Sequence, residues 1–149
     1  MQGRSPLEGL SKQENNSVFI AMDQPYDVDL GKRMQHAAAT HKIALHQGVY
    51  AATLGPEFET VAQVKSLALQ GADLVGMSTV SEVIMGRYFG MSITAVSIIT
   101  NLACGLADTS LSHEVTLAGA KKGADNLKQI LSTFVAQFVS MPAGKVLEQ

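Results

Sequence analysis

Three short apolar runs, each followed by a segment with helical spacing, constrain the fold of this chain most strongly. The runs are Val49–Leu54, Ala72–Met77 and Ser92–Ile99. Parallel strands that are buried on both faces read as continuous apolar runs, and a helical crossover usually joins one strand to the next. The sequence therefore predicts an α/β fold, with a mainly parallel sheet flanked by helices.

Capping residues and terminal glycines predict the helices between these strands. The first helix is expected from about Pro25 to Leu45, behind an Asp23 N-cap. The second begins at Thr60 and stops at Gly71, because glycine readily ends a helix in the left-handed conformation.

Two further helices follow from the same signals. Thr79-Val80-Ser81-Glu82 has the pattern of a capping box, and Gly90 supplies the stop of that helix. A long helix starts near Ser112. It carries one apolar stripe, made of Leu127, Ile130, Leu131, Phe134 and Phe138.

The length of 149 residues fits one domain, with residues 1–23 as loop and residues 24–140 as the α/β core. Two features indicate a part of a larger domain. A loop of more than twenty residues is unusual at the edge of a compact domain, and three strands make a small parallel sheet.

Composition and charge exclude several classes of protein. The chain is 46% hydrophobic, and its net charge of −2 gives no excess of positive charge with which to bind a nucleic acid or an anionic membrane. No apolar stretch is long enough to span a membrane, and the first twenty residues are too polar for a signal peptide. The single cysteine, Cys104, fits a reducing compartment, so we expect a cytoplasmic protein without nucleic-acid or membrane partners.

The commonest catalytic motifs are absent. The sequence has no Gly-rich dinucleotide or P-loop motif. Gly76-Met77-Ser78-Thr79-Val80 lacks the second glycine of a nucleophile elbow, which disfavours a serine hydrolase. His36, His41 and His46 are five residues apart, a spacing that does not place them on one helix face, so no metal site is expected.

Polar residues follow all three predicted strands, where ligands bind in open α/β sheets. They are Glu57–Thr60, Ser78–Thr79 and Thr100–Asn101. Each also has a purely structural interpretation, as a helix cap or a turn. Taken together, a carboxylate and an amide suit the edge of a planar heterocycle, and a helix N-terminus suits phosphate. A purine and phosphate in one pocket is the implied arrangement.

At these positions the chain resembles the trimeric purine nucleoside phosphorylases, over nearly all of its length. The motifs that carry the resemblance are Gly48-Val49-Tyr50, Gly55-Pro56-Glu57-Phe58-Glu59-Thr60, Gly71-Ala72-Asp73, Val75-Gly76-Met77-Ser78-Thr79-Val80, Glu82-Val83-Ile84, Ile99-Thr100-Asn101 and Ser112-His113-Glu114. The resemblance implies a three-layer phosphorylase core and a homotrimer in the complete protein. It also implies reversible phosphorolysis of purine nucleosides, with orthophosphate as co-substrate and no cofactor.

The resemblance also implies two catalytic residues and a set of contacts with the substrate. Asn101 would donate to N7 and contact O6 of the purine, and His113 would bond the 5′-hydroxyl of the ribose. Ser78 would bind phosphate. Because Asn101 is an amide, 6-oxopurines are favoured over the substrates of the related 6-amino phosphorylases. The other substrate-binding residues would be Glu59 at N1–H, Phe58, Val75 and Met77 along base and sugar, Tyr50 by the ribose, Thr100, and Phe19 from a neighbouring subunit.

The chain departs from the family in length. Members of the family are nearly twice as long, and their first half supplies a Gly-rich phosphate loop with an arginine and a histidine. We therefore expect this C-terminal portion alone to have little or no phosphorolysis activity. The alternative is a fragment that acts only in purine binding or oligomer assembly.

Overall fold

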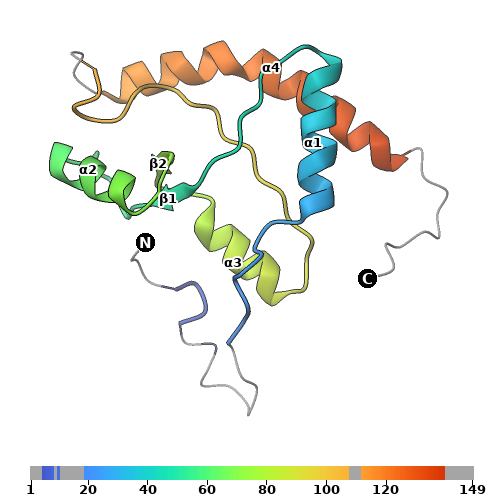
Figure 1. Ribbon diagram of the computed structural model, residues 1–149, viewed down its shortest axis with the longest axis horizontal. Coiled ribbons are helices and arrows are strands. Elements are labelled where there is room, and N and C mark those ends of the chain that lie inside the picture. The colour runs from blue at the N-terminus through green and yellow to red at the C-terminus, as the bar shows by residue number, and fades with distance from the viewer. Residues whose placement is uncertain (1–4, 9, 11–18, 108–111, 140–149) are drawn as a thin grey trace.

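The computed structural model describes residues 5–8, 10, 19–107 and 112–139, and Figure 1 shows their arrangement. Within these ranges the chain forms four α-helices and two β-strands. In chain order they are α1 (Val28–Thr40), β1 (Tyr50–Ala52), α2 (Val61–Leu69), β2 (Leu74–Gly76), α3 (Val80–Tyr88) and α4 (His113–Val139).

The two strands pair in parallel, and α2 forms the crossover between them. In the register of the pair, Ala51 lies opposite Val75. The Asp73 carboxylate accepts the N–H of Val49 at 2.7 Å, and the backbone N–H of Asp73 donates to the carbonyl of Val49 at 3.0 Å. These bonds hold the start of the pair, so the first two predicted strands are confirmed in a shorter form.

The third predicted strand is wrong. In the described part of the chain, the segment from Ser92 to Ile99 belongs to no strand, and the sheet consists of β1 and β2. The end of this segment instead lies against α4, where two glycines allow close approach. A Cβ atom on Gly123 would lie 2.7 Å from Cγ2 of Ile98, and a Cβ atom on Gly119 would lie 2.7 Å from Cα of Thr100.

The strands are also less buried than their apolar sequences predicted. Ala51 is the only buried residue of β1, and every residue of β2 is intermediate in exposure. A two-stranded sheet cannot be covered on both faces as fully as a central strand of a larger parallel sheet. The predicted burial on both faces is therefore wrong for this structure.

Helix α1 starts and ends at other residues than predicted. Its N-cap is Asp27 rather than Asp23, and Oδ1 of Asp27 accepts the N–H groups of Asp29 and Leu30, both at 2.9 Å. Pro25 therefore lies before the helix. The helix ends at Thr40, and Lys42 adopts a positive φ of 56°. Leu45 lies outside the helix and packs back against its apolar face.

Helices α2 and α3 occur where they were predicted, although their caps differ. Thr60 caps α2 in a reciprocal capping box with Gln63, and Gly71 follows the helix with a φ of 91°. The capping box predicted for α3 is wrong, because the Thr79 side chain makes no capping hydrogen bond. Thr79 has a φ of 73°, a conformation that a β-branched residue rarely adopts.

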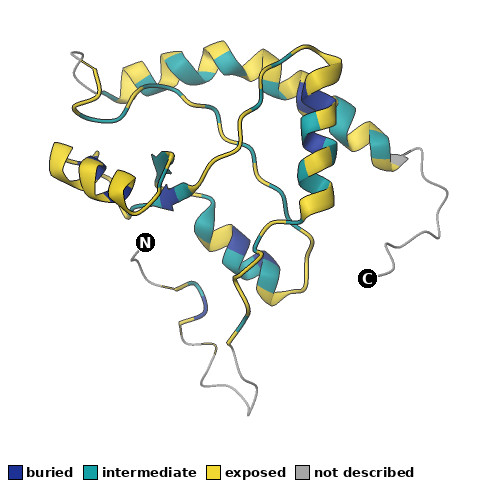
Figure 2. Cartoon of the chain, viewed as in Figure 1, coloured by how far each residue is buried: buried dark blue, intermediate teal, exposed yellow. Residues whose placement is uncertain are grey.

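The buried core lies between α1 and α4 (Figure 2). Met34, Ala37 and Ala38 of α1 pack with Ile130 of α4. Phe134 joins this cluster as predicted for the apolar stripe, whereas Leu131 of the same stripe stays exposed. Outside this cluster, the buried apolar residues are few: Leu7, Ala51, Val64, Leu67 and Val83 in the described part of the chain.

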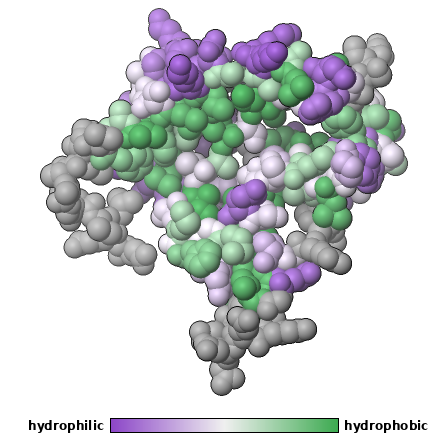
Figure 3. All heavy atoms as spheres, turned by 180° about the vertical axis from the view of Figure 1, so that it is seen from behind, coloured by the Kyte–Doolittle hydropathy of each residue, from purple (hydrophilic) through white to green (hydrophobic). Residues whose placement is uncertain are grey.

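Much apolar surface remains exposed. The face of the molecule in Figure 3 carries a broad hydrophobic area below a hydrophilic upper edge. Among the described residues, no helix combines the length and the hydropathy needed to cross a bilayer. The predicted loop over residues 1–23 falls largely outside the described residues.

Candidate functional site

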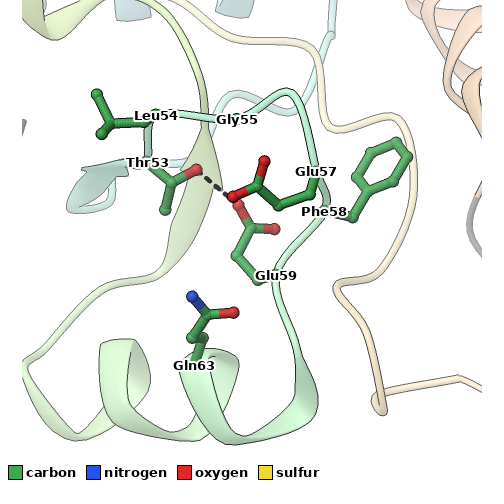
Figure 4. A pocket seen from close by; sticks show the side chains of 7 residues that line it. All are labelled: Thr53, Leu54, Gly55, Glu57, Phe58, Glu59 and Gln63. Atoms are coloured by element: carbon green, nitrogen blue, oxygen red, sulfur yellow. Dashed lines mark hydrogen bonds between the residues drawn. The ribbon is translucent and has the colours of Figure 1, made fainter.

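A cavity of about 200 Å³ lies at the carboxyl end of β1 (Figure 4). Its lining residues come from the segment that joins β1 to α2 and from the first turn of α2. They are Thr53, Leu54, Gly55, Glu57, Phe58, Glu59 and Gln63. Two of the predicted substrate-binding residues, Phe58 and Glu59, therefore share one cavity at the end of a strand.

The conformation of the connecting segment places Glu59 in this cavity. The N–H of Thr53 donates to the carbonyl of Gly76 at 2.9 Å, which continues the strand pairing by one residue. Gly55 then turns the chain with a φ of 67°, next to a cis peptide bond to Pro56. The side chain of Met77 lies directly against Gly55, where any Cβ atom would collide with it. The chain consequently folds back toward the N-cap of α2.

Glu59 is the one buried charged residue in the described part of the chain, with 8% of its surface exposed. Oε1 accepts a hydrogen bond from the Thr53 hydroxyl at 2.7 Å, drawn as a dashed line in Figure 4. Oε2 accepts no hydrogen bond from any described residue and is not sealed from solvent. The carboxylate thus has one oxygen held by the protein and one available to a ligand.

Glu59 is not the cap of the following helix. That role belongs to Thr60, whose hydroxyl accepts the N–H of Gln63 while the Gln63 side chain accepts the N–H of Thr60. The purely structural interpretation of Glu59, as an acidic residue that stabilises a helix N-terminus, therefore does not account for its burial. A buried carboxylate with a single hydrogen bond is costly unless a ligand or water completes its partners.

A second group of polar residues follows β2. The Tyr50 hydroxyl accepts the N–H of Ser78 at 3.3 Å and lies 3.4 Å from the Ser78 hydroxyl. The hydroxyls of Ser78 and Thr79 are 3.2 Å apart. Gly76 permits this arrangement, because any Cβ atom there would collide with the Tyr50 hydroxyl. These hydroxyls lie at the N-terminus of α3, a place where backbone N–H groups favour an anion.

A third group surrounds Asn101, which follows the Ser92–Ile99 segment, and it includes Thr116 of α4. Oδ1 of Asn101 accepts hydrogen bonds from the hydroxyls of Thr100 at 2.6 Å and Thr116 at 3.3 Å. Nδ2 of Asn101 donates to the carbonyl of Leu102 at 3.0 Å. The Thr100 hydroxyl, predicted to contact substrate, is thus engaged with Asn101.

Val75, Met77, His113 and Phe19 neither line the cavity nor take part in the hydrogen bonds of these groups. His113 is the first residue of α4 and is exposed. Val75 is the central residue of β2, and Phe19 has 95% of its surface exposed. The cavity that contains Glu59 is not lined by Asn101, so their meeting around one purine stays a prediction.

Sequence reasoning missed Thr53 and Thr116, the hydroxyl partners of Glu59 and Asn101. For Thr116 a weak signal existed, since it lies three residues after His113 and shares its helix face. No group of three metal-ligating residues occurs in the part of the chain that the structure describes. His41, one of the evenly spaced histidines, instead bonds the hydroxyl of Thr133 on α4 at 2.7 Å.

Comparisons with known proteins identify relatives of this chain. It is 36% identical to purine nucleoside phosphorylase 1 of Bacillus subtilis over 136 residues, which cover 91% of this chain and 50% of that protein. It is also 36% identical to the purine nucleoside phosphorylase of Mycobacterium tuberculosis over 138 residues, 93% of this chain and 47% of that protein. The chain thus spans about half the length of these curated relatives.

Solved structures give the same result. A Schistosoma purine nucleoside phosphorylase in complex with hypoxanthine superposes with a TM-score of 0.76 at 33% identity, covering 83% of this chain and 45% of the other. A methylthioadenosine phosphorylase of Schistosoma mansoni shares the fold, with a TM-score of 0.80 at 20% identity over 87% of this chain and 51% of the other. The sequence model of the phosphorylase superfamily matches residues 1–136. The chain belongs to this superfamily, as a member of its purine nucleoside phosphorylase family.

Proposed function

We propose that this chain carries the base-binding part of a phosphorylase of 6-oxopurine nucleosides. The reaction is the reversible phosphorolysis of a purine nucleoside by orthophosphate, which yields the free base and ribose 1-phosphate. The observation that carries the proposal is the buried Glu59 carboxylate, held by Thr53 and open to a cavity at the end of β1. A carboxylate accepts the N1–H of a 6-oxopurine, whereas N1 of adenine carries no hydrogen and is itself an acceptor.

The chemistry of the reaction suits the other polar groups. As the glycosidic bond breaks, the ribose becomes cationic and the purine gathers negative charge at N7 and O6. A hydrogen-bond donor held there stabilises the transition state more than the ground state. Asn101 is the proposed donor. Its action together with Glu59 requires the two groups to meet around one base, either by movement on binding or in the complete protein.

The remaining assignments concern the sugar and phosphate. Ser78 binds phosphate at the N-terminus of α3, and His113 bonds the 5′-hydroxyl of the ribose. The other contacts with base and sugar come from Phe58, Tyr50, Val75, Met77, Thr100 and, from a neighbouring subunit of a homotrimer, Phe19. Solved relatives in complex with hypoxanthine, inosine, guanosine and adenosine support a purine base or nucleoside as the ligand.

Base binding tests the role of Glu59 directly. Hypoxanthine and adenine are titrated into the purified chain by calorimetry, with Glu59→Gln as the test variant and Glu57→Gln as its control. Glu57 lines the same cavity but is exposed. Because a hydrogen bond to a charged group is worth about 1.5–3 kcal/mol, E59Q should weaken hypoxanthine binding about 10- to 100-fold. Equal weakening by E57Q and E59Q would contradict the assignment.

A second candidate is a purine-binding or assembly role without turnover, which is favoured by the absence of Asn101 from the lining of the Glu59 cavity. Cleavage of inosine by the purified chain, with and without phosphate, separates the two. Phosphate-dependent release of hypoxanthine supports the enzyme. Base binding that is unchanged by phosphate, with no cleavage, supports the second candidate.

A further inference from the structure

We infer that Thr116 is a positioning residue, which together with Thr100 fixes the Asn101 amide so that it offers a donor and not an acceptor to a bound base. The inference rests on the proposed function, in which Asn101 reads the edge of a purine. It adds a residue that neither the sequence motifs nor the cavity singled out. The argument starts from the groups around the amide.

The carbonyl of Leu102 determines which way the amide faces. Nδ2 of Asn101 lies 3.0 Å from this carbonyl oxygen. A carbonyl oxygen cannot donate, so an amide turned by 180° would set two acceptors against each other. The amide NH₂ must therefore face Leu102, and the amide oxygen must face the two threonines.

The two threonine hydroxyls then occupy the amide oxygen. Thr100 donates to Oδ1 at 2.6 Å, and Thr116 at 3.3 Å. The Thr116 hydroxyl also lies 3.2 Å from the carbonyl of Ser112, so this carbonyl and the Asn101 amide oxygen are two acceptors within reach of its one proton. An amide oxygen has two lone pairs, and both are directed at hydroxyls.

What remains available on the amide is a hydrogen. Nδ2 carries two hydrogens, and only the one given to Leu102 has an acceptor among the described residues. A 6-oxopurine presents acceptors at O6 and N7, whereas a 6-aminopurine presents a donor at position 6. The fixed amide therefore matches the first class and leaves the amino group of the second without an acceptor.

The packing of α4 brings Thr116 to this place. Gly119 lies one turn after Thr116, and any Cβ atom on it would collide with the carbonyl oxygen of Thr100. The helix can approach the Thr100–Asn101 backbone only because this position has no side chain. His113 lies three residues before Thr116 on the same face, so one helix turn carries both the supporting hydroxyl and the proposed sugar contact.

Two variants of the full chain test the inference by base affinity. Thr116→Val keeps the shape and removes the hydroxyl, and Thr116→Ser keeps the hydroxyl. We expect T116V to weaken hypoxanthine binding about three- to tenfold, as for loss of one hydrogen bond, without weakening adenine binding. We expect T116S to keep the wild-type ratio of the two affinities. A wild-type chain that prefers hypoxanthine and a T116V chain with the same ratio would overturn the inference and leave the proposed function standing.

A measurement without ligand keeps the two proposals separate. The order parameter of the Asn101 side-chain amide is measured by ¹⁵N magic-angle-spinning NMR on the sedimented chain. This method does not require the chain to be a monomer. It should fall in T116V and stay near the wild-type value in T116S. If the wild-type chain binds no base but the order falls as expected, the proposed function fails and the positioning role stands. Equal order in all three chains refutes the positioning role.

Discussion

At the scale of single residues, Glu59 depends on one hydroxyl. Thr53 is its hydrogen-bond partner in the described part of the chain, at 2.7 Å. Thr53→Val keeps the shape of the side chain but leaves a buried carboxylate without a donor. We expect the free energy of unfolding to fall by about 1–3 kcal/mol, measured by urea denaturation. Thr53→Ser keeps the donor and should lie within about 0.5 kcal/mol of the wild type on the same scale. Similar losses in both variants would show that the hydroxyl is not the cause.

Asp27 makes a residue-scale prediction about pH. Its pKa lies below the ordinary value of 3.8, first because of the hydrogen bond from the Leu30 backbone and then because of one from the Ser92 side chain. A lowered pKa in the folded state gives stability that is fully present above 3.8 and is lost as the pH falls through the folded-state pKa. Asp27→Asn keeps a good N-cap but cannot lose a charge.

The difference in unfolding free energy between wild type and D27N should therefore be largest near neutral pH and shrink in acid. Urea denaturation of both chains at neutral pH and below 3.8 measures it. A difference in unfolding free energy that stays constant over this pH range would mean that the charge of the Asp27 carboxylate does not contribute to the stability of the N-cap.

At the scale of elements, two helical glycines should respond to alanine in opposite directions. A Cβ atom on Gly119 of α4 would collide with the Thr100 backbone, whereas a Cβ atom on Gly31 of α1 meets nothing within 4 Å. Gly31→Ala should stabilise the chain by about 0.8–1 kcal/mol, the difference in helix propensity. Gly119→Ala should destabilise it by about 1–3 kcal/mol, because the helix must shift away from a backbone. Thermal unfolding of both variants checks the signs, and stabilisation by both would show that α4 does not pack closely on Thr100.

The elements that sequence could predict are those with local signals. Helix α2 follows from Thr60 and Gly71, because a cap and a stop act within a few residues. The start of α1 was misplaced because Asp23 and Asp27 are both good N-caps, and only the contacts of Asp27 distinguish them. The segment from Ser92 to Ile99 has the composition of a strand, but a strand also needs a partner, which a local pattern cannot supply.

At the scale of the whole molecule, the candidate site also has a part that the sequence could predict and a part that it could not. The rule that ligands bind beyond the carboxyl ends of parallel strands predicted Glu59, Ser78 and Asn101. The structure gives Glu59 a cavity and Ser78 a contact with Tyr50. The hydroxyl partners of Glu59 and Asn101 were missed. In the case of Asn101 the reason is distance along the chain, because Thr116 is fifteen residues away and meets it only through the packing of α4.

The isolated chain should associate with itself. In the part that the structure describes, no large side chain is fully buried, while Leu69 at the end of α2 is 90% exposed and Phe89 after α3 is 68% exposed. Apolar area on this scale, together with the open edges of a two-stranded sheet, favours contact with another chain over contact with water. Sedimentation velocity at increasing concentration should therefore show a rising mean mass.

Leu69→Lys removes exposed apolar area without touching the core, so it should lower the degree of association and leave the free energy of unfolding within about 0.5 kcal/mol of the wild type. A wild-type chain that sediments as a single monomeric species at every concentration would show that these exposed apolar surfaces do not drive self-association.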